Sequence, residues 1–253
     1  MLWYKAWLET RWRFAIGFVL LVCSAMFVVM AYPRVVGLIP LAPKTGGGGE
    51  IGRRIREAVE LSRTYRGYVW SQWFNQNLIQ TGTVFAILLG SGAPLAADRS
   101  ILFTLSLPVS RGRLASVRAA TGLAELFAIV FASSLVVPLM SPAVGERYSL
   151  ASALVHGTCM FVASGLFFSL AFLISSIFND IWRPLGIAVA VAVALNLLEQ
   201  ILRAQTRIGI FHLMSGEMYF RSGALPWLGL VSAALMSAAM LYGAAAILAR
   251  RDY

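Results

Sequence analysis

Charged side chains are scarce in this sequence. Asp, Glu, Lys and Arg together make up 13% of its 253 residues, whereas 59% of the residues are hydrophobic. An ordinary soluble domain has about 25% charged and roughly 45–50% apolar residues. A soluble fold of this length cannot bury that much apolar side chain, so we expect lipid to be the solvent for most of the chain.

Residues that build catalytic and metal centres are also few. The two cysteines, Cys23 and Cys159, lie inside apolar runs and form neither a metal-ligand spacing nor a disulfide framework. His156 has a methionine, Met160, four residues on, and not a second ligand. No G-x-x-x-x-G-K-[ST], H-E-x-x-H or G-x-S-x-G motif occurs. We therefore expect a chain that is not an enzyme and that holds no metal or cofactor of its own.

Acidic residues are the scarcer of the two signs. The chain has 11 Asp and Glu against 21 Lys and Arg, a net charge of +10. A basic surplus can indicate nucleic-acid binding, but no recognition motif accompanies it. The Lys and Arg residues fall almost entirely between apolar runs, as loop charges of membrane proteins do. We expect membrane lipids, and no nucleic acid, as partners.

Long apolar runs recur along the whole chain. Six are long enough to cross a hydrocarbon core of about 30 Å as a helix. They span approximately residues 14–32, 68–94, 119–138, 150–178, 185–202 and 224–248. We predict an all-α integral membrane protein whose residues 1–253 form a single transmembrane domain of six helices.

Two amphipathic segments accompany these predicted spans. In residues 1–13 aromatic side chains such as Trp3 and Trp7 recur at helical spacing opposite charged ones, which is typical of a helix lying in the headgroup region. Pro33 and the prolines and glycines after it are expected to end the first span. Residues 51–66 then carry apolar and charged side chains on different sides. We predict an amphipathic helix there, on the extracytoplasmic surface.

The second predicted span carries a row of uncharged polar side chains. Spacings of four, four and three residues place them on one helical face: Gln72, Gln76, Gln80 and Thr83. Amides are unfavourable against acyl chains, so they must face other helices or water. Two interpretations remain open, which are hydrogen bonding that packs the helices and a polar wall of a substrate path.

One acidic residue, Glu125, lies well inside a predicted span. It follows Arg118 by about two helical turns and shares its face. An ionisable residue at this depth is a candidate functional residue, and as a proton site it would indicate a proton-coupled secondary transporter. The alternative is a structural acid that pairs with Arg118 or with a neighbouring helix. The six spans show no obvious internal repeat or interrupted helix pair, which disfavours the secondary transporter.

The segment between the second and third predicted spans, residues 94–118, begins and ends in charge. Its middle, residues 101–107, is amphipathic and stops at Pro108, which donates no backbone hydrogen bond. We predict a short helix here that a soluble partner can bind. The candidate docking residues are Asp98, Arg99, Leu105, Pro108, Arg111 and Arg113.

Lys and Arg near the span ends set the orientation of a membrane protein. Six spans place both termini on the same side as residues 94–118. With the long stretch 34–66 set aside, that side holds ten Lys and Arg against four; with it included, the two sides are nearly equal. Setting it aside, we predict an inner or plasma membrane protein with both termini cytoplasmic.

With this loop in the cytoplasm, the chain resembles the permease subunits of type-two ABC transporters. The resemblance is carried by residues 1–13, by the loop AADRSILFTLSLPVSRGRLASVR with its SLPVSR at residues 106–111, and by the terminal ARRDY. The layout covers nearly the whole chain, and the loop is its only motif-like part. Asp98 stands where family members commonly carry glutamate, and Ser100-Ile101 replaces a frequent Gly-Thr pair.

The resemblance implies a transport subunit energised from outside. Such a permease pairs with a second copy or a paralogue and docks cytoplasmic ABC ATPase subunits, which bind the ATP and Mg²⁺. Residues 94–118 would contain its coupling helix, and the N-terminal helix would contribute to the same contact. The cargo would be a hydrophobic or amphipathic compound. The residues that would line its path are Gln72, Gln76, Gln80, Thr83 and Glu125. The absence of a phosphate-loop motif from the sequence is independent support for this expectation, because the energy for transport must then come from a partner. A membrane scaffold without cargo is a third hypothesis.

Overall fold

The computed structural model describes residues 2–38, 59–92, 111–178, 180–202 and 209–250. Within these ranges the chain is almost wholly helical and contains no strand. In chain order the elements are α1 (Leu2–Leu38), α3 (Tyr65–Val69), the π-helix η2 (Trp70–Asn77), α4 (Leu78–Gly90), α6 (Arg111–Met140), the 3₁₀ turn η3 (Ser141–Val144), α7 (Leu150–Ser175), α8 (Trp182–Leu202), α9 (Ile210–Ser215), α10 (Glu217–Ser222) and α11 (Trp227–Arg250).

Five helices are long and apolar enough to cross a membrane. They cover Leu2–Gly37, Gly112–Val144, Leu150–Ser175, Trp182–Ile201 and Trp227–Arg250. The prediction of an all-α chain with helices long and apolar enough to span a membrane is confirmed for the described residues. The second predicted span corresponds to α3, η2 and α4, which follow one another without a break from residue 65 to residue 90. Its polar first half sets it apart from the other five.

The start of the chain differs from the prediction. Residues 2–38 form one helix, so the interfacial N-terminal helix and the first span are a single element that also continues through Pro33. Proline removes one intrahelical hydrogen bond, but packing offsets this locally. The Tyr68 hydroxyl donates to the Val28 carbonyl at 3.1 Å, and the Tyr32 ring packs against Tyr65 at 4.9 Å between centroids. Tertiary contacts therefore override the proline signal.

Other predicted boundaries shift as well. The helix α6 begins at Arg111, so Arg111 and Arg113 belong to its first turn and not to a loop. The stretch between the last two predicted spans contains the two short helices α9 and α10. The predicted coupling helix at 101–107 lies outside the described residues, as does the first half of the predicted helix at 51–66.

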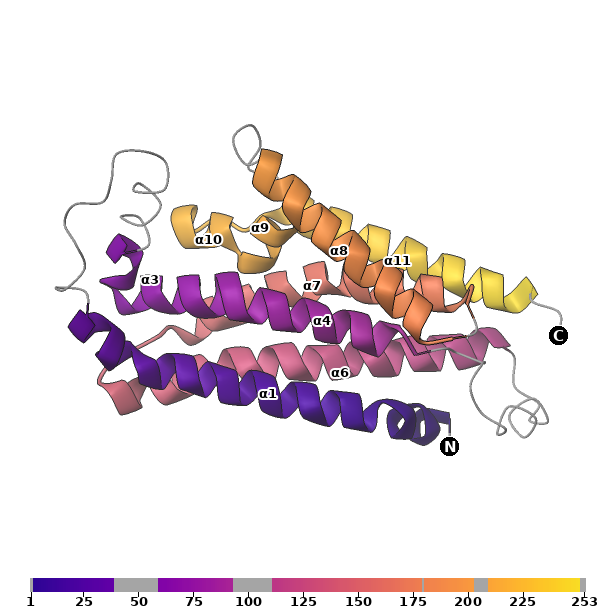
Figure 1. Cartoon of the computed structure of the whole chain (residues 1–253), viewed down its shortest axis with the longest axis horizontal. Helices are drawn as coiled ribbons and strands as arrows, with labels where there is room; N and C mark the ends of the chain where they lie inside the picture. Colours follow the sequence, from indigo (N-terminus) through magenta and orange to yellow (C-terminus); the bar gives the residue numbers. More distant parts are fainter. Residues whose placement is uncertain (1, 39–58, 93–110, 179, 203–208, 251–253) are drawn as a thin grey trace.

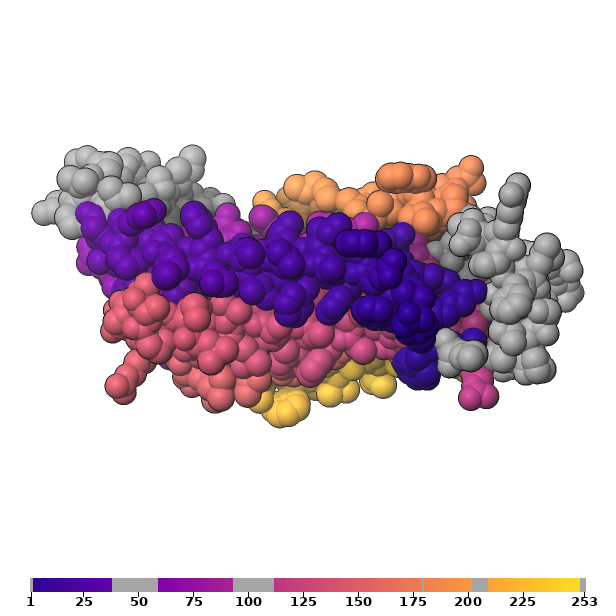
Figure 2. All heavy atoms as spheres, turned by 90° about the horizontal axis from the view of Figure 1, so that it is seen from below, coloured from indigo at the N-terminus to yellow at the C-terminus, as the bar shows by residue number. Residues whose placement is uncertain are grey.

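The long helices run side by side along one axis (Figure 1). The helix α1 begins, α4 ends, α6 begins and α11 ends at the same end of the bundle, here called the terminal end. The short helices α3 and α10 lie towards the opposite end. Figure 2 shows α1 running along most of the length of one face of the molecule, beside the pink spheres of the α6 and α7 region.

The central helix is α7, which packs against α4, α6, α8, α9 and α11. Its aromatic side chains Phe167, Phe168 and Phe172 are fully or almost fully buried. Glycines on the neighbouring helices allow close approach, because a Cβ on Gly90 would collide with the Phe168 carbonyl and one on Gly122 with the Phe168 ring. Lipid offers no hydrophobic force between helices, so such close packing is what holds a membrane bundle together.

Candidate functional site

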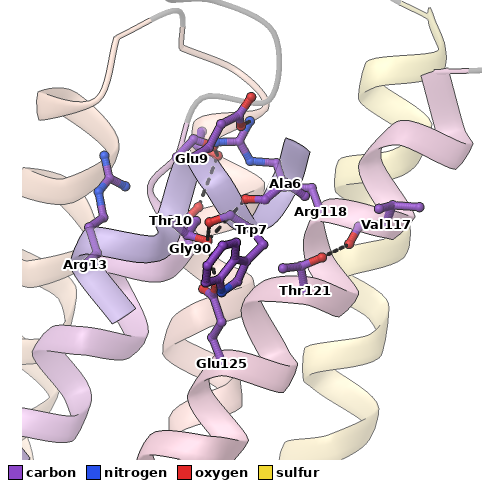
Figure 3. Close-up of polar contacts among 12 residues, drawn as sticks. Ala6, Trp7, Glu9, Thr10, Arg13, Gly90, Val117, Arg118, Thr121 and Glu125 are labelled. Atoms are coloured by element: carbon purple, nitrogen blue, oxygen red, sulfur yellow. Dashed lines mark hydrogen bonds and ion pairs between the residues drawn. The ribbon is translucent and has the colours of Figure 1, made fainter. Parts of the chain in front are cut away.

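Three helices meet at the terminal end, and we take this junction as the candidate functional site. It comprises the first turns of α1, the last turn of α4 and the first turns of α6 (Figure 3). Residues 93–110, which connect α4 to α6, are not described, so Asp98, Arg99, Leu105 and Pro108 cannot be placed. Of the predicted docking residues, Arg111 begins α6 and Arg113 is exposed two residues further on. The described junction is therefore the base from which the predicted docking loop leaves and to which it returns.

One face of α1 builds its side of the junction. Ala6, Thr10, Gly17 and Leu21 are buried and recur at helical spacing, which turns this stripe towards the bundle. The other face exposes a group of aromatic side chains, Trp3, Tyr4, Trp7 and Trp12. Tryptophan and tyrosine are enriched at the level of the lipid headgroups. The helix between Trp12 and Arg34 rises about 33 Å at roughly 1.5 Å per residue, close to one hydrocarbon core of about 30 Å. This is the spacing expected of a helix whose aromatic end lies at the headgroup level.

An ion pair joins α1 to α6. The Arg118 Nη1 atom lies 3.1 Å from Glu9 Oε2, and the side chains are 17% and 41% exposed. The sequence had left open a pairing of Arg118 with Glu125, and the structure pairs it with Glu9. The guanidinium also lies against Gly92, where any Cβ would collide with Arg118 Nη2. Arg118 thus contacts both α1 and the residues that follow α4.

Glu125 is buried and hydrogen-bonded to α1. Its Oε1 atom lies 2.5 Å from Thr10 Oγ1, and its Oε2 atom has no hydrogen-bond partner among the described residues. The Thr10 hydroxyl also lies 3.2 Å from the Ala6 carbonyl. Because a hydroxyl has one proton, it donates to an ionised Glu125, or accepts from a protonated one and donates to Ala6. The neighbouring helix thus provides the partner that a structural role for Glu125 requires.

A third contact ties α1 to α4. Arg13 Nη1 donates to the Leu88 carbonyl at 3.0 Å. Leu88 lies in the last turn of α4, where carbonyls lack intrahelical donors and a cation is favoured by the helix dipole. These residues lie within little more than one turn of α1, and Figure 3 shows Glu9 and Thr10 reaching from α1 towards Arg118 and Glu125. The first turns of α1 therefore fasten both helices that carry the ends of the predicted docking loop.

No known family matched. Comparisons with family models, with curated proteins and with solved structures found no match to this chain. The functional argument therefore depends on the geometry of the chain itself.

The predicted polar face of the second span is divided by the structure. Gln72 is half-buried, Gln76 and Gln80 are exposed, and Thr83 is buried with its Oγ1 3.9 Å from Met214 Sδ. The division lies within α4, where Gln80 is exposed and Thr83, three residues further on, is buried, whereas Gln76 in η2 and Gln80 are both exposed. The π-helix was not predicted. Within it, Asn77 Nδ2 donates to the Gln72 carbonyl at 2.7 Å. The polar composition of this segment is the only local feature that could have indicated an irregular helix.

Gln76 and Gln80 face the outside of the single bundle. Neither makes a hydrogen bond within the described part of the chain, so the helix-packing interpretation lacks a partner for them there. An exposed amide inside a membrane needs a polar partner from elsewhere. The path interpretation therefore places the path on the surface of this bundle.

Within the described ranges, no group of three or more His, Cys, Asp or Glu side chains is placed to hold a metal ion.

Proposed function

We propose that this chain is the membrane-spanning permease subunit of an ATP-driven ABC exporter of a hydrophobic or amphipathic compound. It pairs with a second copy or a paralogue, and cytoplasmic ABC ATPase subunits supply the ATP and Mg²⁺. The observation that carries the proposal is the junction at the terminal end, which links both ends of a charged loop to a third helix through Glu9–Arg118, Thr10–Glu125 and Arg13–Leu88.

The junction is suited to transmit force. A partner that moves residues 93–110 moves the end of α4 and the start of α6, because these elements flank that segment. The contacts from Glu9 and Arg13 then carry the displacement into α1. Three of the long helices would shift together, as a rocking transporter requires. Since the sequence has no phosphate loop, the energy for this shift comes from the partner.

The arrangement of the helices supports the proposed topology. If residues 65–90 cross the membrane as the other five long helices do, six crossings place both termini on one side, in agreement with the shared terminal end in Figure 1. With residues 34–66 set aside, the surplus of Lys and Arg on that side favours the cytoplasm. Gln76 and Gln80 then lie on the outer surface of the bundle, where a second copy and a cargo molecule can reach them.

Co-purification tests the proposal. The tagged full-length chain is expressed in its native host and purified in mild detergent, and the proteins that accompany it are identified by mass spectrometry. We expect an ABC ATPase in stoichiometric amount, with ATP hydrolysis that the permease stimulates. The double variant Asp98→Lys/Arg111→Glu should lose that stimulation about tenfold or more, whereas the control Arg147→Glu, an exposed residue beyond the opposite end of α6, should keep it. Recovery of the chain without any ATPase, or full stimulation in the double variant, contradicts the proposal.

One observation favours a second candidate, a proton-coupled secondary transporter. Glu125 is buried in a span, and its Oε2 atom has no partner among the described residues. A proton carrier there would drive transport along a pH gradient without ATP, and Glu125→Gln would abolish it. Transport that needs ATP and survives Glu125→Gln would exclude this candidate.

A further inference from the structure

An arginine towards the opposite end of the bundle is held in place by aromatic rings. The Arg66 guanidinium of α3 lies over the Phe220 ring of α10, 5.3 Å from its centroid. The Phe220 ring stacks on Trp70, with centroids 4.4 Å apart, and Trp70 Nε1 donates to the Ser215 carbonyl at 3.1 Å. Arg66 is exposed, and no Asp or Glu of the described ranges forms an ion pair with it. It therefore presents a positioned cation that no described acid neutralises.

Two tyrosine hydroxyls near this arginine also lack acceptors. Tyr148, between η3 and α7, is 8% exposed, and its buried hydroxyl has no hydrogen-bond partner among the described residues. The half-buried Tyr219 of α10 forms no hydrogen bond through its hydroxyl within that part of the chain either. Burial raises the pKa of Tyr148, the charge of Arg66 lowers it and Tyr219 raises it, so both groups lie within electrostatic reach of Tyr148. Such a buried polar group normally has a partner.

Stacked rings hold both tyrosines against the same part of the bundle. Phe74 of η2 stacks on Tyr148 and on His156 of α7, with centroid distances of 6.1 and 4.6 Å. The Tyr219 ring meets the His156 ring edge-on at 5.6 Å. His156 Nδ1 donates to the Ser215 carbonyl at 3.0 Å, because a carbonyl only accepts. The two hydroxyls and the guanidinium, here called the three donors, are thus carried by side chains that packing holds in place.

Two acids at this end of the bundle do not neutralise the three donors. Glu217 accepts a hydrogen bond from Arg221 Nε at 2.7 Å and lies 2.5 Å from His212 Nδ1. The hydrogen bond with His212, followed by that with Arg221, lowers the pKa of Glu217 to about 2 against the opposing effect of burial. The half-buried Glu146 acts electrostatically on other tyrosines and not on Tyr148. An anion from outside the chain can therefore satisfy the donors.

Phosphate matches this donor set. A guanidinium presents N–H groups in one plane and binds phosphate oxygens in pairs. The oxygens of a tetrahedral phosphate point in different directions, so hydroxyls from two further elements can reach those that remain. A carboxylate has only two oxygens, and the Arg66 fork alone can engage both. It would leave the buried Tyr148 hydroxyl without a partner, which is unfavourable.

The surroundings of the site indicate that this phosphate belongs to an amphipathic molecule. The helix α11, which follows α10, begins with Trp227 and Leu228, whose side chains are 65% and 90% exposed. Tryptophan is enriched at the level of lipid headgroups, where lipid phosphates lie. In the proposed topology this end of the bundle is extracytoplasmic. An amphipathic molecule in the outer leaflet would thus carry its head at the height of the three donors.

We propose that Arg66, Tyr148 and Tyr219 bind the phosphate group of an amphipathic molecule at the extracytoplasmic surface. The assignment of this molecule as cargo rests on the proposed transport function, which it deepens by giving the exported compound a phosphate head. The binding itself requires the permease chain alone.

Ligand binding to the purified full-length chain tests the proposal. Dioctanoyl phosphatidic acid is added in dodecyl maltoside without any ATPase, and the midpoint of thermal unfolding is followed. A ligand that binds only the folded state raises this midpoint with concentration. Dioctanoylglycerol, with the same tails and no phosphate, should not raise it, and inorganic phosphate should do so only at much higher concentration. Absence of a rise with phosphatidic acid, or an equal rise with dioctanoylglycerol, overturns the site. Equal affinity for inorganic phosphate overturns the amphipathic ligand.

Three variants and a matched control assign the binding to named donors. Arg66→Gln should weaken binding of dioctanoyl phosphatidic acid about tenfold or more, because hydrogen bonds to charged groups are the stronger ones. Tyr148→Phe and Tyr219→Phe keep their rings and remove only the hydroxyls, so each should weaken it about two- to tenfold. The control Arg63→Gln removes an exposed arginine three residues before Arg66 and should bind as the parent does. Full affinity in Arg66→Gln, or an equal loss in the control, overturns the proposal.

Stability without ligand separates binding from a structural role. Since the Tyr148 hydroxyl has no partner within the described chain, Tyr148→Phe should keep or raise the unfolding midpoint when no lipid is present. A clear fall in that midpoint with unchanged affinity would make the hydroxyl structural and remove it from the site. Phosphate binding without recovery of an ATPase would count against the proposed function and leave the site standing. Recovery of the ATPase without phosphate binding would overturn the site alone.

Discussion

The ion pair between Glu9 and Arg118 yields the sharpest prediction for the junction. Glu9→Arg places two cations together, Arg118→Glu places two carboxylates together, and the double exchange restores opposite charges in reversed order. The atoms lie 3.1 Å apart, with Arg118 largely buried and Glu9 41% exposed. At an effective dielectric constant near 20, a pair at this range interacts by about 4 kcal/mol. The exposure of Glu9 reduces this, so we expect a coupling energy of about 2 kcal/mol.

A double-mutant cycle of Glu9→Ala and Arg118→Ala measures this coupling, because neither single change creates a like-charge contact, and the charge exchange tests it independently. The four proteins are unfolded reversibly in mixed micelles, and the free energy of unfolding is followed by tryptophan fluorescence. Each single variant should lose stability, and the exchange should regain at least half of the combined loss. Stimulation of the partner ATPase should follow the same order, since the contact joins the base of the docking loop to α1.

The chain contains a matched control for this cycle. Arg183 Nε and Asp180 Oδ2 are also 3.1 Å apart, but their side chains are 70% and 42% exposed. The same exchange there should give a coupling below about 0.5 kcal/mol, because exposed pairs contribute little. If the Glu9 and Arg118 variants prove additive, or if the two pairs couple equally, the ion pair does not hold the junction together.

Three further predictions concern other parts of the chain. Replacing Gln76 and Gln80 by Leu should reduce export at least tenfold while the thermal stability of the bundle stays the same or rises, because neither amide bonds within the described chain; unchanged export would show that these amides are not part of the path. Gly90→Ala should lower the free energy of unfolding by about 1–3 kcal/mol, since its Cβ would collide with the Phe168 carbonyl, whereas Gly112→Ala, with open space around it, should not. The Glu217 pKa of about 2 lies below its ordinary 4.5, so the stability difference between the parent and Glu217→Gln should be constant above about pH 5 and shrink as the pH falls towards 2; a difference that instead vanishes near neutral pH would refute this assignment.

Much of the architecture could be predicted from the sequence because membrane helices depend on local properties. An apolar run of sufficient length has few alternatives in lipid, since every backbone group must bond within its own segment. The long helices could therefore be predicted from the sequence, whereas several of their ends could not. Pro33 predicts an end to α1, but the helix continues past it. The packing of Tyr32 on Tyr65, which is distant in sequence, cannot be predicted from local sequence.

The sequence by itself determined that this chain is built of long apolar helices, and it located the unusual polar residues on them. Hydropathy marked the apolar helices, and the positions of Glu125 and of the glutamines along them followed from counting residues. Which groups these residues meet was decided only by the tertiary structure. Arg118 pairs with Glu9, more than a hundred residues earlier, and the Ser215 carbonyl meets donors on η2 and α7. Such partners depend on how the helices are turned about their axes, and η2 changes that rotation within a span.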